Sequence, residues 1–203
     1  MAADDLMPLV AAERRAFGAV LAGLPEPAWD APSLCDGWAV RDVVAHVTMP
    51  FRTSAPRFVL ELVRSGGRFA AMADRVARRD GAQPTDVLVA WLRDNAEHPW
   101  TPPGGGKEGA LTHDVVHGLD ITRPLGIERE VQPERFRVVL DTLVSPRSRR
   151  HFGAEGHTGR FEASDVDWSH GTGAPVTGRA VDLVLLLTGR PVAAGAIVGD
   201  EGR

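Results

Sequence analysis

The chain has 203 residues, 43% of them hydrophobic and 25% charged, and its formal net charge is −4. This composition is typical of a globular protein with one ordinary domain or one domain and a small appendage, and the acidic balance argues against a nucleic-acid partner. No apolar run is long enough for a transmembrane helix, and the single cysteine, Cys35, excludes an internal disulfide, so we expect a cytoplasmic protein without a membrane partner.

Apolar residues recur at helical spacing in the N-terminal region. They predict a first helix over residues 4–23, with Glu13, Arg14 and Arg15 on its polar face. Residues 24–32 contain three prolines, and we therefore expect a loop there.

A second helix is predicted to begin at Trp38, after a tight connector over residues 33–37. Its apolar positions keep the helical period, but Pro50 and Pro56 are expected to kink it or to break it into pieces. Two consecutive glycines then end this helix or form a joint, and a further helical stretch continues through Arg79.

The third predicted helix has Thr85 as its N-cap and ends near His98. A loop rich in proline and glycine separates it from a fourth helix over residues 108–122. A fifth helix is predicted to start after Pro133, because proline is favoured in the first turn.

The fold class that follows is mostly α. Residues 1–150 are predicted to form an up-down four-helix-type bundle, and residues 151–203 a small C-terminal α+β appendage. Short alternating stretches at 160–163 and 166–168 predict strands, and an apolar segment before Gly189 predicts a short final helix with this glycine at its C-cap.

Three histidines are candidate metal ligands. His113 and His117 lie four residues apart within the fourth predicted helix, so both imidazoles fall on one face and could reach one cation. His46 lies on the apolar side of the second predicted helix. Three inward histidines suit a divalent site with open positions for water or substrate, the pattern of catalytic zinc. The other interpretation is three neutral core histidines, and the residues alone leave both open.

Three polar residues near the histidine pair are weaker candidates. Asp114 and Asp120 could each orient an imidazole, although the favoured interpretation is surface aspartates on an amphipathic helix, or for Asp120 a local hydrogen bond near the helix end. Arg123 could bind a substrate carboxylate, or it could simply favour the C-terminus of the helix.

Other reactive residue types are expected to be structural. Cys35 precedes a helix start, where a thiolate would be stabilised, but we expect it to be a small buried apolar residue. Asp165 and Asp167 share one face of a predicted strand and are expected to be solvated.

Three segments resemble the mycothiol-dependent maleylpyruvate isomerase family, which is part of the DinB/YfiT-like superfamily. The segment PSLCDGWAVRDVVAHV (residues 32–47) looks like the opening motif of that family. The segment HDVVHGLDITRPLG (residues 113–126) resembles its second metal motif. Residues 159–191 resemble the end of many members.

The resemblance implies a DinB-like bundle that holds a divalent metal through His46, His113 and His117. The family typically has glutamate where this chain has His113, so the site is similar to the three-histidine version found elsewhere in the superfamily. Zinc is the expected metal, and three imidazoles also accept nickel or iron.

The resemblance also implies an enzyme with mycothiol as thiol cosubstrate and a small electrophile as partner, acting as a transferase or isomerase through a metal-bound thiolate or water. The alternative is a metal-binding or ligand-sensing bundle without catalysis. Related bundles often pair, which suggests a homodimer.

Overall fold

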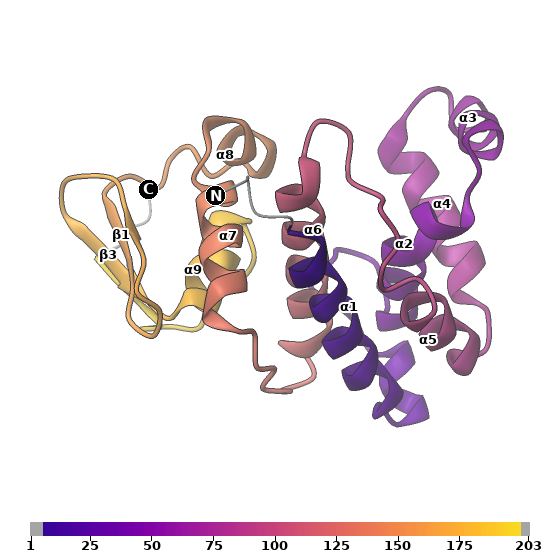
Figure 1. The fold of residues 1–203 in the computed structure, drawn as a ribbon, viewed down its shortest axis with the longest axis horizontal. Helices are drawn as coiled ribbons and strands as arrows, with labels where there is room; N and C mark the ends of the chain where they lie inside the picture. Colours follow the sequence, from indigo (N-terminus) through magenta and orange to yellow (C-terminus); the bar gives the residue numbers. More distant parts are fainter. Residues whose placement is uncertain (1–5, 200–203) are drawn as a thin grey trace. The chain divides into compact units, whose positions relative to one another are not determined.

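The computed structural model describes residues 6–199, which contain nine α-helices and a small C-terminal sheet (Figure 1). The predicted mostly helical fold with a C-terminal α+β part is confirmed. The chain forms two compact units: Met1–Thr101 with His117–Arg129, and Pro102–Val116 with Glu130–Arg203. The predicted domain division after residue 150 stays a prediction.

The first unit is entirely helical in its regular structure. Its elements are α1 (Met7–Ala22), the 3-10 helix η1 (Glu26–Asp30), α2 (Val40–Arg52), α3 (Ala55–Arg64), α4 (Phe69–Gly81), α5 (Thr85–Arg93) and the last turns of α6 (Gly106–Thr122).

Apolar faces of η1 and of four helices, α1, α2, α5 and the end of α6, form the core of this unit. Its fully packed members are Phe17, Leu21, Trp29, Val40, Val43, Val44, Ala45, Val47, Leu88, Leu92 and Ile121. Because α2 and the end of α6 both contribute to this core, close packing fixes the positions of these two helices relative to each other.

Two charged residues of α1 lie inside the protein, where the sequence predicted a solvated face. Arg14 is fully buried, and its Nη1 donates hydrogen bonds to the carbonyls of Ala96 and His98 at 3.3 and 2.7 Å. Glu13 is also fully buried and forms an ion pair with Arg129. Buried charges are tolerated when they are paired in this way, so the prediction for Glu13 and Arg14 was wrong.

Several predicted boundaries shift by a few residues. The second predicted helix is broken at Thr53 and Ser54, while Pro50 is accommodated inside α2. Thr85 is the first residue of α5 rather than its N-cap, and this helix ends at Arg93. The predicted loop at 24–32 contains η1.

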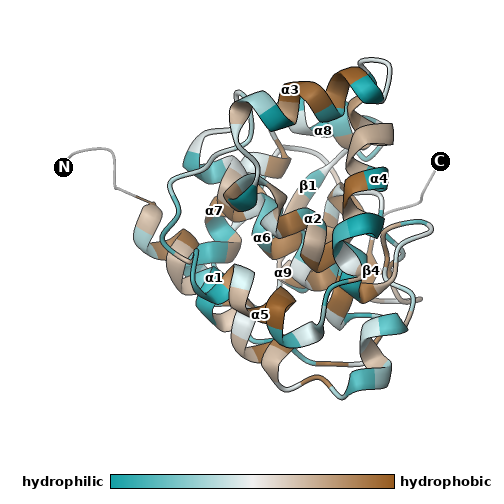
Figure 2. Ribbon diagram, turned by 90° about the vertical axis from the view of Figure 1, so that its right-hand side faces the viewer, coloured by the Kyte–Doolittle hydropathy of each residue, from teal (hydrophilic) through white to brown (hydrophobic). Residues whose placement is uncertain are grey.

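Helix α3 is attached to α4 through one buried carboxylate and through Phe58 and Leu62, which pack against the cluster that contains Met72 and Val76. Glu61 is the only buried residue of α3, and it pairs with Arg75 and Arg79 of α4 at 2.6 and 2.8 Å. Val59 and Val63 of α3 are 57% and 68% exposed, and Figure 2 shows strongly hydrophobic residues along this helix.

The second unit joins the start of α6 and three further helices to a four-stranded mixed sheet with order β2-β1-β3-β4, in which β1 and β3 are parallel. Its other elements are α7 (Pro133–Leu143), α8 (Pro146–Phe152), α9 (Ala180–Leu187), β1 (Arg160–Ala163), β2 (Ser169–His170), β3 (Pro175–Gly178) and β4 (Ile197–Val198).

The tail differs from prediction in two places. The stretch at 166–168 belongs to a turn, and the strand begins at Ser169. Asp165 in this turn is not simply solvated, because its Oδ1 accepts a hydrogen bond from the backbone N–H of Ala180 at 2.7 Å. Thr188 is the C-cap of α9, and Gly189 follows it with φ of 69°.

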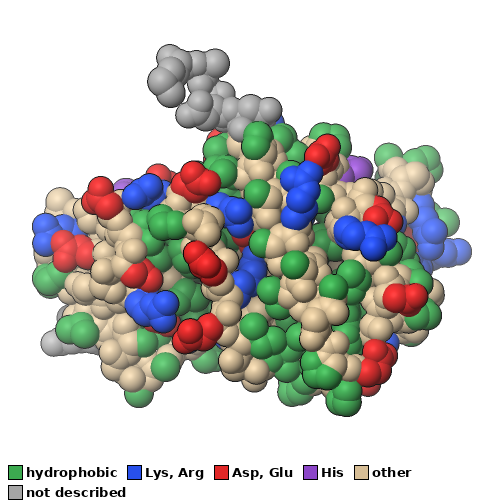
Figure 3. Space-filling model, turned by 60° about the horizontal axis from the view of Figure 1, so that its bottom comes forward, with side chains coloured by type: hydrophobic (Ala, Val, Ile, Leu, Met, Phe, Trp, Pro, Cys, Tyr) green, Lys and Arg blue, Asp and Glu red, His purple; other side chains and the backbone are tan. Residues whose placement is uncertain are grey.

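The surface carries charges of both signs. Basic and acidic side chains are interspersed over the face drawn in Figure 3. In the part of the chain that the structure describes, no helix combines the length and apolar character that crossing a membrane requires.

Candidate metal centre

His46 is held at the edge of the first unit's core. Val43 and Val47 of the same helix are fully buried, whereas His46 is half-buried. The Trp38 ring packs with its centroid 5.0 Å from that of His46. Trp38 is itself fixed, because its Nε1 donates a hydrogen bond to Asp74 at 2.9 Å, and this bond lowers the pKa of that carboxyl.

His117 faces His46 and is oriented by a carboxylate of its own helix. The ring centroids of the two histidines are 5.1 Å apart in an edge-to-face arrangement. The Nδ1 atom of His117 lies 2.9 Å from Oδ2 of Asp120, whose side chain is fully buried. As long as the Asp120 carboxylate accepts a proton from Nδ1, the remaining nitrogen, Nε2, is the one available to a cation.

The same arrangement is repeated one helical turn earlier. The Nδ1 atom of His113 lies 2.9 Å from Oδ1 of Asp114, which is also fully buried. Because α6 is one continuous helix, His113 and His117 lie on one face. The interpretation of Asp114 and Asp120 as surface aspartates was therefore wrong, and their contact with the imidazoles fits the orienting role. The participation of His113 in a site with His46 stays a prediction.

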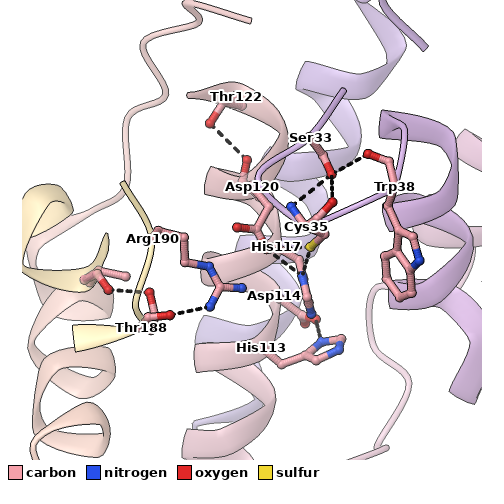
Figure 4. A network of polar contacts seen from close by, with 12 residues as sticks. Ser33, Cys35, Trp38, His113, Asp114, His117, Asp120, Thr122, Thr188 and Arg190 are labelled. Carbon is pink, nitrogen blue, oxygen red and sulfur yellow. Dashed lines mark hydrogen bonds and ion pairs between the residues drawn. The ribbon is translucent and has the colours of Figure 1, made fainter. Parts of the chain in front are cut away.

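Cys35 lies against His117 and Asp120, a placement that the sequence reasoning missed. Its Sγ is 3.1 Å from Oδ2 of Asp120 and 3.7 Å from Nδ1 of His117 (Figure 4). The connector over residues 33–37 is fixed by Ser33, whose Oγ donates to the carbonyl of Trp38 at 2.8 Å. The backbone N–H of Leu34 donates to the carbonyl of Asp120 at 2.9 Å, which docks the connector on α6.

Two further residues, Arg123 and His98, were considered as polar or capping residues in the sequence. Arg123 is half-buried directly after α6, and its predicted carboxylate binding stays a prediction. His98 accepts a hydrogen bond at Nδ1 from the backbone N–H of Trp100 at 3.1 Å. Burial, followed by the nearby Arg14, lowers the pKa of His98, so this histidine is a neutral local cap.

These residues fit a divalent cation. Imidazoles held by carboxylates through Nδ1 are the usual form of histidine ligands in metal proteins. Neutral imidazole nitrogen suits zinc, nickel and iron rather than magnesium or calcium. Within the first unit, the ligand atoms of Cys35, His117 and Asp120 also lie within 4.8 Å of one another.

Comparison with known proteins agrees with this fold. Residues 10–99, which contain both Cys35 and His46, match the family described as mycothiol maleylpyruvate isomerase N-terminal domain. The crystal structure of the mycothiol-dependent maleylpyruvate isomerase is 13% identical over 95% of this chain and 90% of that chain, with a TM-score of 0.58. The crystal structure of a histidine-to-alanine mutant of that isomerase gives 12% identity over the same shares and a TM-score of 0.57. At this identity the likeness shows the fold. No curated protein matches the sequence significantly.

Proposed function

We propose that the chain is a divalent-metal-dependent enzyme that uses a low-molecular-weight thiol, because residues 10–99 match the family described as mycothiol maleylpyruvate isomerase N-terminal domain. The thiol is mycothiol and its partner is a small electrophile, which the enzyme thiolates or isomerises through a thiol adduct. His46, His113 and His117 are the proposed ligands, and zinc is the proposed metal.

The observation that carries this proposal is the repeated pairing of histidine and buried aspartate on α6. Asp114 and Asp120 each fix one imidazole through Nδ1. Fixed rings lose little conformational freedom when a ligand binds, and the carboxylates make the imidazoles better donors. Histidines that serve only to fill the core do not require a buried carboxylate at Nδ1, and here two histidines of one helix each have one.

A bound divalent cation would favour the thiolate form of a coordinated thiol and polarise a substrate carbonyl. The side chains around it prepare that chemistry. Trp38 packs against the ring of the half-buried His46 on one side. Three neutral imidazoles leave more positive charge at the centre than two imidazoles and a glutamate, which favours an anionic thiolate. Arg123 is the proposed contact for a substrate carboxylate.

The test is elemental analysis of untagged protein beside His46→Ala and His113→Ala. The matched control is His170→Ala, because His170 is exposed on β2. In protein as purified, before any metal is added, we expect about one metal per chain in the wild type and the control, and loss of that metal in both site variants. Absence of metal after reconstitution with zinc would contradict the proposal.

Catalysis is tested separately by incubating the metal-loaded protein with mycothiol and a panel of small electrophiles. Consumption of both reactants, lost in His46→Ala, is the expected result. Stoichiometric metal without consumption would favour the metal-binding or ligand-sensing bundle instead. A homodimer and a cytoplasmic location remain predictions.

A further inference from the structure

Three different ligand types converge on the side of His117 that faces the connector. The sulfur of Cys35, the Nδ1 of His117 and the Oδ2 of Asp120 form a triangle with sides of 3.7, 2.9 and 3.1 Å. The three residues belong to one compact unit, so the triangle depends on no other part of the chain.

The triangle has nearly the size that a tetrahedral cation needs. With zinc bond lengths of about 2.3 Å to sulfur and about 2.0 Å to nitrogen and oxygen, tetrahedral angles place the ligand atoms roughly 3.3 to 3.6 Å apart. The observed sulfur–nitrogen side is close to this range, and the two sides that end on Asp120 are shorter by a few tenths of an ångström. Small side-chain shifts would therefore admit a cation.

The charge balance also favours a cation. The thiolate of Cys35 and the carboxylate of Asp120 together carry two negative charges, which a divalent cation neutralises. Asp120 is fully buried and Cys35 is half-buried, so an unbalanced charge there would be costly. A thiolate ligand favours borderline and soft cations such as zinc, cobalt or cadmium over magnesium and calcium.

We propose that Cys35, His117 and Asp120 form a second, thiolate-containing cation site for zinc or a similar divalent metal. Binding releases the proton of the Cys35 thiol to solvent. The Nδ1 proton of His117 moves to Nε2 where that nitrogen is free, and it is released as well only where Nε2 already holds a metal, which leaves a bridging imidazolate. The site shares the His117 ring with the proposed three-histidine centre but uses its other nitrogen. It needs neither His46 nor His113.

The test uses the fact that the chain has one cysteine, so any protein thiolate bound to metal must be Cys35. Untagged wild type and His46→Ala are titrated with Co²⁺, and thiolate-to-cobalt charge-transfer absorption is followed in the near ultraviolet. We expect the absorption in both proteins, its removal by competing zinc, and its loss in Cys35→Ser. Cobalt binding without this absorption, or no cobalt binding at all, would overturn the proposal.

A second measurement covers the case in which Cys35→Ser does not fold. Alkylation of Cys35 is followed by mass spectrometry in folded His46→Ala, with and without zinc. Zinc is expected to slow alkylation at least about tenfold, and a chelator is expected to restore the rate. An unchanged rate would show that zinc does not bind the thiol.

The two proposals fail in different ways. One metal per chain without thiolate absorption would leave the three-histidine centre standing and remove the second site. Thiolate absorption together with full metal content in both His46→Ala and His113→Ala would support the second site and remove the three-histidine centre.

Discussion

The Nδ1 atom of His117 lies 2.9 Å from the Oδ2 atom of Asp120, three residues later on α6. The aspartate is fully buried, so it has no water to satisfy it and its contacts are fixed by the fold. The carboxylate sets which ring nitrogen of His117 carries the proton, and thereby which nitrogen is available to a cation.

Replacing Asp120 by asparagine is therefore expected to weaken metal binding by about 10- to 100-fold, the usual cost of losing a carboxylate behind a histidine ligand. Competition with a metal-sensitive dye would measure the affinity. The control is Asp141→Asn, whose carboxylate accepts a hydrogen bond from Trp168 at 2.8 Å in the other unit. Equal affinities in the two variants would show that Asp120 does not act on a metal ligand.

The resemblance to the isomerase family implies a glutamate at the position where this chain has His113. We expect His113→Glu to keep about one metal per chain, because carboxylate oxygen is also a good ligand, and to shift the preference from zinc toward harder ions such as manganese. Competition between zinc and manganese, read by elemental analysis, would measure the shift. Wild-type metal content and preference in both His113→Glu and His113→Ala would show that His113 is not a ligand.

The helical positions of the candidate histidines were predictable from the sequence, because spacing of four places His113 and His117 on one face of α6 and the apolar period predicts His46 on the core side of α2. The position of Cys35 next to His117 and Asp120 was not predictable. It depends on the contact between Leu34 and Asp120, which are 86 positions apart in the chain, and no local sequence pattern indicates such a contact.

The burial of charged residues was missed for the same reason. Glu13 and Arg14 follow a pattern that normally indicates a solvated face, and their partners lie far away in the sequence, Arg129 for the glutamate and the carbonyls of Ala96 and His98 for the arginine. A helix that is covered on several sides has no single polar face, so amphipathic spacing cannot reveal which of its charges are paired.

We expect the attachment of α3 to α4 through Glu61 to be sensitive to acid. Hydrogen bonds from Arg75 and then Arg79 lower the pKa of Glu61, which means that the folded state binds its proton less readily than the unfolded state. The ionised Glu61 contributes fully to the free energy of unfolding when the pH is well above the ordinary glutamate pKa. This contribution is lost as the pH falls below the ordinary pKa toward the lowered pKa of the folded state.

We expect Glu61→Gln to speed amide hydrogen exchange in α3 at neutral pH by roughly fivefold, corresponding to about 1 kcal/mol for the charge-assisted bonds. The ratio of variant to wild-type rates should approach one at acid pH, where the wild type is protonated too. Glu97→Gln is the control, because Glu97 is 79% exposed and pairs with a half-exposed Arg15. A ratio that stays constant with pH would rule out the charge as the cause.

Asp165 and Asp167, two residues apart near the C-terminal sheet, differ in how their side chains contribute to stability. Asp165 accepts the backbone N–H of Ala180, the first residue of α9, at 2.7 Å, while the N-cap residue Arg179 makes no side-chain cap of its own. Ala180 is fully buried behind this carboxylate, so removing the carboxylate takes away the partner of its N–H. Asp167 engages Arg137 only through its backbone carbonyl, which a substitution preserves.

Asp165→Ala is therefore expected to lower the free energy of unfolding by about 1 kcal/mol, whereas Asp167→Ala should stay within about 0.5 kcal/mol of the wild type. Urea denaturation followed by circular dichroism measures both. A conservative variant, Asp165→Asn, keeps an oxygen acceptor and should recover most of the loss, which separates the hydrogen bond from the charge near the start of the helix. If Asp165→Ala and Asp167→Ala were equally stable, both carboxylates would be solvated, as the alternation in the sequence first predicted.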